Sequence, residues 1–221
     1  MSQSPIYSDR LLIRMFHGSI AKPRFLQNGK TENASLNPYI EIADMKITDK
    51  QSQLLRPNVG GMMGGHVAMQ VGDRVYGFYY KDANNIHWFN SEPFNSEFHN
   101  YSIEEWEFIV TNKRETCFHL PATEIELSDL QAYFTQNCLN PSLDYSFFGE
   151  RCASNVYHLL IKLGKIPSGN YLLQAFWPGA LRRTLLKFSA VNQWAVTVKE
   201  GSKNEWWQGT IRSFPPHPWN R

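Results

Sequence analysis

Hydrophobic positions in the first half of the chain either form short runs or alternate with polar ones, which is typical of β-strands. The segment His66–Tyr80 is divided by the turn pair Gly72-Asp73, so it predicts a hairpin. Counted across that turn, His66 lies roughly opposite Tyr79 or Tyr80, at the outer end of its strand. The predicted strands are Leu11–His17, Tyr39–Ile42, the two arms of the hairpin, Glu105–Val110 and Cys117–Leu120.

Apolar residues recur at helical spacing in the second half of the chain. Glu124–Asn137 is predicted to be an amphipathic helix with Ser128 as its N-cap. The later elements are a helix from about Arg151 to Gly164, a helical run Leu181–Phe188 that begins at Pro178, and two strands, Trp194–Val198 and Trp206–Ile211. Strands, helices and then strands again predict an α+β fold.

The 221 residues suit one domain with a sizeable core, and residues 190–221 form a candidate C-terminal strand extension of it. A hydrophobic content of 42% and an aromatic content of 14% favour a folded globule over a disordered chain. With 22 basic and 20 acidic residues, the net charge is +2 and no Lys/Arg block stands out. Nucleic acid is therefore not an expected partner.

The three cysteines form no Cys-x-x-Cys pair, which argues against a disulfide framework and against a thiolate zinc site. We predict neither a metal nor a cofactor. The sequence shows no secretion signal and no apolar run long enough to span a membrane. A cytoplasmic location is the expectation, although export by a signal-independent route, such as a bacterial injection apparatus, would leave no mark on the sequence.

Cys152 stands where an extended aromatic run meets the helix predicted from about Arg151. At a helix N-terminus a thiol lies against unpaired N–H groups and the positive end of the helix dipole, which favours the thiolate. A nucleophilic thiol needs a base, and His66 is the best placed histidine because a glycine-rich approach leaves room beside it. The alternative is structural: the apolar residues of the helix continue the same face, and Cys152 would be a small core residue.

The order of these motifs resembles the permuted branch of the NlpC/P60 papain-like superfamily, which includes YiiX-like proteins and is related to the lecithin:retinol acyltransferase group. The matching residues, spread over about 58–164, are Gly65-His66-Val67 with the Gly72-Asp73 turn, the spacing Tyr145-x-x-x-Gly149-x-x-Cys152, and Arg151–Val156. The resemblance implies a circularly permuted papain-like fold, in which a small antiparallel sheet packs on the helix that bears the nucleophile. It also implies Cys152 as the nucleophile and His66 as the base.

The residue that orients the imidazole of His66 is left open between Asp82 and His87. A carboxylate at Asp82 would hold an imidazolium, whereas His87 would match a His-His-Cys arrangement. Asp82 lies in a Lys-Asp-Ala-Asn-Asn sequence that is more typical of a solvated turn. The residues expected to contact a substrate are Gly65, Tyr79, Tyr80 and Tyr145.

The sequence therefore predicts a cysteine-dependent hydrolase of amide bonds that works through a thioester acyl-enzyme. By resemblance, the favoured substrate is a peptidoglycan-type peptide, and a lipid acyl ester is the alternative. Two other classes stay open, namely a non-catalytic binding module on the same fold and a partner protein that uses the aromatic C-terminal region. Residues 164–180 either cover the site or simply connect two helices, and the oligomeric state is left open.

Overall fold

A computed structural model describes residues 10–16, 18–19, 65–82, 87–110, 113–199 and 204–205. Its strands are β1 (Leu11–Phe16), β2 (Gly18–Ser19), β3 (His66–Val71), β4 (Arg74–Tyr80), β5 (Ser96–Ser102), β6 (Glu115–His119), β7 (Ala195–Lys199) and β8 (Asn204–Glu205). Its helices are α3 (Ile103–Ile109), α4 (Glu124–Leu139), α5 (Cys152–Lys162), α6 (Tyr171–Gln174) and α7 (Pro178–Asn192). The strands predicted at Tyr39–Ile42 and Trp206–Ile211 lie outside the described residues.

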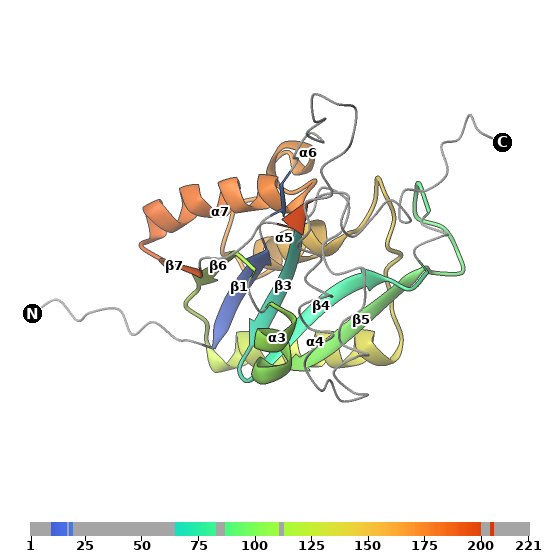
Figure 1. The fold of residues 1–221 in the computed structure, drawn as a ribbon, viewed down its shortest axis with the longest axis horizontal. Helices are drawn as coiled ribbons and strands as arrows, with labels where there is room; N and C mark the ends of the chain where they lie inside the picture. Colours follow the sequence, from blue (N-terminus) through green and yellow to red (C-terminus); the bar gives the residue numbers. More distant parts are fainter. Residues whose placement is uncertain are drawn as a thin grey trace, which may run out of the picture.

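Six strands form one antiparallel sheet in the order β5-β4-β3-β1-β6-β7 (Figure 1). Together with the helices, this sheet confirms the predicted α+β class. β3 and β4 form the predicted hairpin, and Gly72 takes the positive φ of 63° that its turn requires. The pairing of β3 with β4 runs only as far as Ala68 and Gly77. The first two residues of β3 therefore have no β4 partner in this ladder.

The alternation of side chains along the strands gives the sheet two buried faces. On one face, Val67, Met69 and Val71 join a core cluster with α4, α5 and α7. On the other face, Phe16 and Ala68 join a smaller cluster with residues of α3 and its C-terminal end. Helix α3 contacts β4 and β5 of the sheet (Figure 1). The large cluster holds most of the core, and α5 crosses it under β3 and β4.

Helix α5 forms as its sequence predicts. Arg151 is the N-cap of the helix. Its backbone N–H donates to Ser154 Oγ over 2.7 Å, so this N–H group has a hydrogen-bond acceptor. Leu160 is fully buried against the sheet. Gly164 takes a φ of 66° just after the helix, where residues other than glycine would be strained.

Two sequence predictions are wrong at the level of single elements. The segment predicted as strand Glu105–Val110 lies mostly in helix α3, because Ser102 Oγ accepts from Glu105 N over 3.1 Å and Glu105 Oε2 accepts from Ser102 N over 2.8 Å. Trp106 and Val110, four residues apart, are both fully buried, as one helix face requires. Helix α4 begins after Thr123, which caps it with Glu126, and the predicted N-cap Ser128 lies inside the helix.

The start of α7 lies against the start of β3. Pro178 is the first residue of α7, as predicted from its fixed φ. A Cβ placed on Gly65 would lie 2.9 Å from Pro178 Cβ and 3.3 Å from the Phe16 carbonyl oxygen. Gly65 is therefore needed for close packing between the sheet and α7, rather than for open space beside His66.

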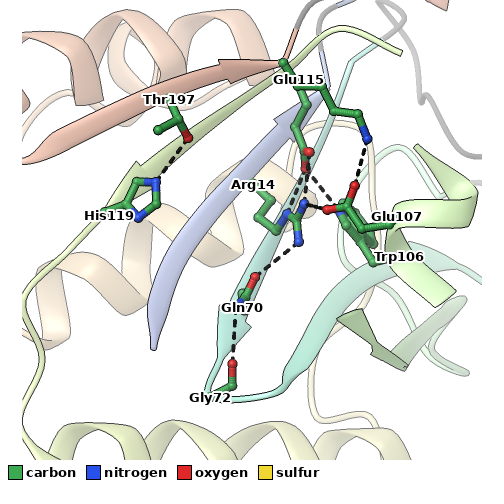
Figure 2. Close-up of polar contacts among 9 residues, drawn as sticks. Arg14, Gln70, Gly72, Trp106, Glu107, Glu115, His119 and Thr197 are labelled. Atoms are coloured by element: carbon green, nitrogen blue, oxygen red, sulfur yellow. Dashed lines mark hydrogen bonds and ion pairs between the residues drawn. The ribbon is translucent and has the colours of Figure 1, made fainter. Parts of the chain in front are cut away.

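A buried ion cluster holds the α3 face of the sheet together (Figure 2). Arg14 Nε donates to Glu115 Oε1 over 2.9 Å, and Trp106 Nε1 donates to the same oxygen over 2.9 Å. The Arg14 guanidinium also contacts Gln70 and Glu107, so the cluster joins three strands to α3. Glu115 is 1% exposed, and burial of an ion pair this deep requires that each polar atom find a partner.

Candidate active site around Cys152

Cys152 is the first residue of α5, and its side chain faces the start of β3, which pairs with β1 but not with β4. The backbone N–H groups of Val67 and Ala153 act on Sγ as donors that lower the pKa of the thiol. The Tyr145 hydroxyl lies 4.0 Å from Sγ. Three donors therefore converge on one sulfur at a helix N-terminus, which is the environment that stabilises a thiolate.

The thiol is nevertheless buried, with 4% of the residue exposed. Burial raises the pKa of Cys152, and this effect outweighs the lowering by the Val67 N–H, the positive charge of Arg151 and the Tyr145 hydroxyl. The sequence predicts a thiol of lowered pKa, and in this conformation the opposite holds. The donors are in place, but the buried sulfur is closed to reactants from solvent.

His66 begins β3 one residue before Val67, and its ring lies on the other face of the sheet. The imidazole stacks on Tyr79 with 4.5 Å between ring centroids, and it contacts Phe16 and Trp106 at 6.1 and 6.4 Å. Within the described residues no hydrogen bond joins His66 to Cys152, and His66 Nε2 is buried without a partner. The backbone of Val67, the residue after His66, therefore lies near the sulfur, whereas the imidazole of His66 does not.

Burial also sets the charge of His66. It lowers the pKa of the imidazole to about 3, and the nearby His99 and Lys113 add to the effect. The ring is therefore neutral at physiological pH, which is the state that a general base requires. In this conformation, however, a proton would be held only weakly.

Neither of the two candidates for the orienting residue contacts His66. Asp82 is exposed, and its backbone N–H and carbonyl are paired with the side chain of Asn95, as expected of a turn residue. His87 Nδ1 lies 2.8 Å from Asp144 Oδ2. Asp144 Oδ1 also accepts from Asn95 N over 2.8 Å, so this carboxylate fixes the segment from His87 to Asn95. The side chain of Tyr145 points the other way, into the core with Cys152.

The four residues predicted to contact a substrate are all buried. Tyr145 is the one that reaches the thiol, and its ring meets Tyr80 edge-on at 5.5 Å. Tyr79 lies with His66 on the α3 face, and Gly65 packs against α7. Tyr80 and Tyr145 thus form one wall of the thiol site, whereas Tyr79 belongs to the opposite side of the sheet.

Sequence reasoning missed Arg151 as a residue of the site. Its guanidinium is buried over the ring of Phe176, 3.9 Å from the centroid, and 5.7 Å from the centroid of Phe147. Nη2 donates to the carbonyl oxygen of Phe176, in the segment between α6 and α7. The available signal was a single arginine between an aromatic run and the helix start, at Phe147-Phe148-Gly149-Glu150-Arg151.

Among the described residues, no group of three or more His, Cys, Asp or Glu side chains is placed to hold a metal ion. No helix in the described ranges has both the length and the apolar character needed to cross a bilayer. Comparisons with protein-family models, with curated proteins and with solved structures find no match. A function can therefore be inferred only from the chemistry of this chain's own residues.

Replacing Tyr145 with phenylalanine is expected to slow alkylation of Cys152 by iodoacetamide about threefold at pH 8. The hydroxyl is one of the donors that favour the thiolate, and a weak hydrogen bond contributes about that factor. The measurement is the labelling rate of the Cys152 peptide by mass spectrometry. Tyr171→Phe is the control, because its hydroxyl donates to the Gly149 carbonyl and not to the sulfur. Equal rates in both variants would contradict the prediction.

Proposed function

We propose that the protein is a cysteine-dependent hydrolase of amide bonds with Cys152 as its nucleophile. The single observation that carries this proposal is the convergence of donors on Cys152 Sγ at the start of α5: the Val67 and Ala153 N–H groups and the Tyr145 hydroxyl. A cysteine that serves only as core filling needs no such donors. The permuted papain-like arrangement belongs to the same proposal, supported by a histidine-led strand that precedes the cysteine-led helix.

The proposed reaction has two acyl-transfer steps. Sγ forms a bond to the carbonyl carbon, the C–N bond breaks, and the amine leaves with the proton taken from the thiol. Water then adds to the thioester, the C–S bond breaks, and the thiol regains a proton as the carboxylic acid product leaves. The backbone N–H of Cys152, at the helix N-terminus, is the donor proposed for the developing oxyanion.

His66 is the base proposed for this reaction, and it requires a change of conformation. The ring is neutral at physiological pH, and its Nε2 has no hydrogen-bond partner among the described residues, so no existing bond of that atom opposes the change. Because the His66 ring lies on the opposite face of the sheet from Sγ, this change must involve the backbone at the start of β3, which is paired with β1 through Phe16 but not with β4. Movement toward the sulfur would leave the apolar stack on Tyr79 and raise the affinity of the imidazole for a proton.

The proposed substrate is a peptide amide of the peptidoglycan type, with a lipid acyl ester as the alternative. An observation that favours the alternative is the exposed aromatic pair Phe89 and Phe148, which are 70% and 47% exposed and stack at 5.4 Å. Phe148 lies in the segment that leads into α5. A substrate panel should therefore include both amides and esters.

The test is hydrolysis of peptidoglycan-type peptide amides and of p-nitrophenyl acyl esters by the full chain. Cys152→Ala should lower the rate about a thousandfold or more, and His66→Gln about a hundredfold. Cys138→Ser is the matched control, because Cys138 is a half-buried thiol on α4. Full activity of Cys152→Ala on every substrate that the wild type cleaves would refute the proposal. A thioester adduct on the Cys152 peptide would support it directly.

A non-catalytic binding module is the second candidate function. The observation that favours it is the position of the His66 ring, which lies across the sheet from α5. In that case Cys152 would react with iodoacetamide only at high pH. The variants Cys152→Ala and His66→Gln would both bind a peptide as tightly as the wild type. Hydrolysis above the level of Cys152→Ala would exclude this candidate.

A further inference from the structure

Arg151 carries a buried positive charge directly beside Cys152. The residue is 8% exposed, and its guanidinium lies over the ring of Phe176 with the ring of Phe147 further away. One nitrogen, Nη2, donates to the Phe176 carbonyl oxygen. The buried Nε–H has no acceptor among the described residues. This guanidinium is therefore incompletely satisfied.

No carboxylate in the described part of the chain neutralises Arg151. The adjacent Glu150 is committed elsewhere: its Oε2 accepts from Ser154 Oγ over 2.9 Å, and its Oε1 lies 2.8 Å from His158 Nδ1. An arginine side chain keeps its charge in proteins, and a buried charge without a counter-ion is unfavourable. A buried arginine without a counter-ion among the described residues is typical of a site that receives an anion.

The position of Arg151 adds a second source of positive potential. It is the N-cap of α5, a helix of 11 residues, whose first-turn N–H groups and dipole favour an anion at this end. The charge of Arg151 also acts on Cys152 and Tyr145: burial raises the pKa of both groups, and the nearby guanidinium opposes part of that rise. An anion held by Arg151 would lie close to the sulfur.

We propose that Arg151, together with the first turn of α5, binds a carboxylate of the substrate beside the bond that Cys152 attacks. This inference rests on the proposed function, and it narrows the substrate to an acidic acyl compound or peptide. The carboxylate takes a hydrogen bond from Nε and competes with the Phe176 carbonyl for Nη2, which gives the two-point geometry that arginine prefers. Exchange at Nη2 also removes the hydrogen bond between Arg151 and Phe176, in the segment between α6 and α7.

Two alkylating reagents of nearly equal size test the inference without a known substrate. Iodoacetate carries a carboxylate, whereas iodoacetamide carries a neutral amide. The measured quantity is the ratio of the two labelling rates at Cys152, each followed by mass spectrometry and divided by the rate with glutathione. Changes in the thiol itself affect both reagents alike and cancel in the ratio.

The ratio of iodoacetate to iodoacetamide should be at least about tenfold higher in the wild type than in Arg151→Met, since a charge-assisted hydrogen bond contributes about that factor. Arg151→Lys keeps the positive charge but lacks the guanidinium Nε–H, so it should give an intermediate ratio. It replaces Arg151→Met in the comparison if that variant fails to fold. Equal ratios in wild type and variant would overturn the inference, as would failure of both reagents to label folded wild-type protein. A raised ratio without any amide hydrolysis would support the carboxylate site and refute only the catalytic proposal.

Discussion

Glu115→Ala is expected to lower the free energy of unfolding by about 3–5 kcal/mol, the largest effect on stability that we predict. The carboxylate is 1% exposed, and its removal leaves the Arg14 guanidinium, 7% exposed, without its main counter-ion. It also removes the acceptor of Trp106 Nε1 (Figure 2). Although burial lowers the pKa of Arg14, the hydrogen bonds and charge of Glu115 raise it above its usual value, so this arginine stays charged. Urea unfolding at pH 7 gives the measurement.

Two controls separate the cost of leaving Arg14 without a counter-ion from the net contribution of the Arg14–Glu115 ion pair to stability. Glu107→Ala removes the other carboxylate on Arg14, but its side chain is 41% exposed, so the expected loss is about 1 kcal/mol or less. The double variant Arg14→Met/Glu115→Leu replaces both charges by apolar groups and should recover more than half of the loss. If the double variant were as unstable as the single one, an uncompensated charge would not be the cause.

Lowering the pH from 7 to 4.5 is expected to cost the wild type about 2–3 kcal/mol more stability than His66→Leu. The pKa of His66 is lowered to about 3 in the folded state, whereas an unfolded histidine titrates near its ordinary value of about 6.5. Between these two values the unfolded chain binds a proton that the folded chain does not. Stability therefore falls as the pH drops from about 6.5 toward 3, and it is unaffected by this group above that window.

Urea unfolding at pH 7, 5.5 and 4.5 measures this loss, and the difference between variants removes the contribution of other acidic groups. His119→Gln is the control, since His119 lies at the rim of the sheet with Nε2 3.1 Å from Thr197 Oγ1. It should lose as much stability as the wild type. Parallel curves for the wild type and His66→Leu would show that His66 is not a buried neutral imidazole.

The parts of the fold that could be predicted from sequence are those with local signals. The α5 helix follows from its apolar spacing and from Gly164, and the β3–β4 hairpin follows from its turn pair. Glu105–Val110 was misassigned because a segment of that length fits both the strand and the helix period. The capping box between Ser102 and Glu105 favours the helix there, and Ser102 lies outside the segment that was assigned as a strand.

The site was only partly predictable for a different reason. The place of Cys152 at a helix start is local, but the face of the sheet that α5 covers is set by long-range packing. Along a strand, neighbouring side chains point to opposite faces. Which of His66 and Val67 points toward Cys152 therefore depends on the face of the sheet that α5 packs against. The same reasoning applies to Arg151, whose aromatic neighbour Phe176 comes from another helix connection.

The order of strands in the sheet has a consequence for folding. β1 lies inside the sheet, between β3 and β6, although it is near the start of the chain. The buried bond between Arg14 and Glu115 joins residues 101 positions apart. During synthesis β1 can pair with β3 once that strand has emerged, but its other edge stays unpaired until β6 follows, and such non-local pairing folds slowly. During that interval the apolar strand Leu11–Phe16 is the segment of the described sheet most in need of protection from aggregation.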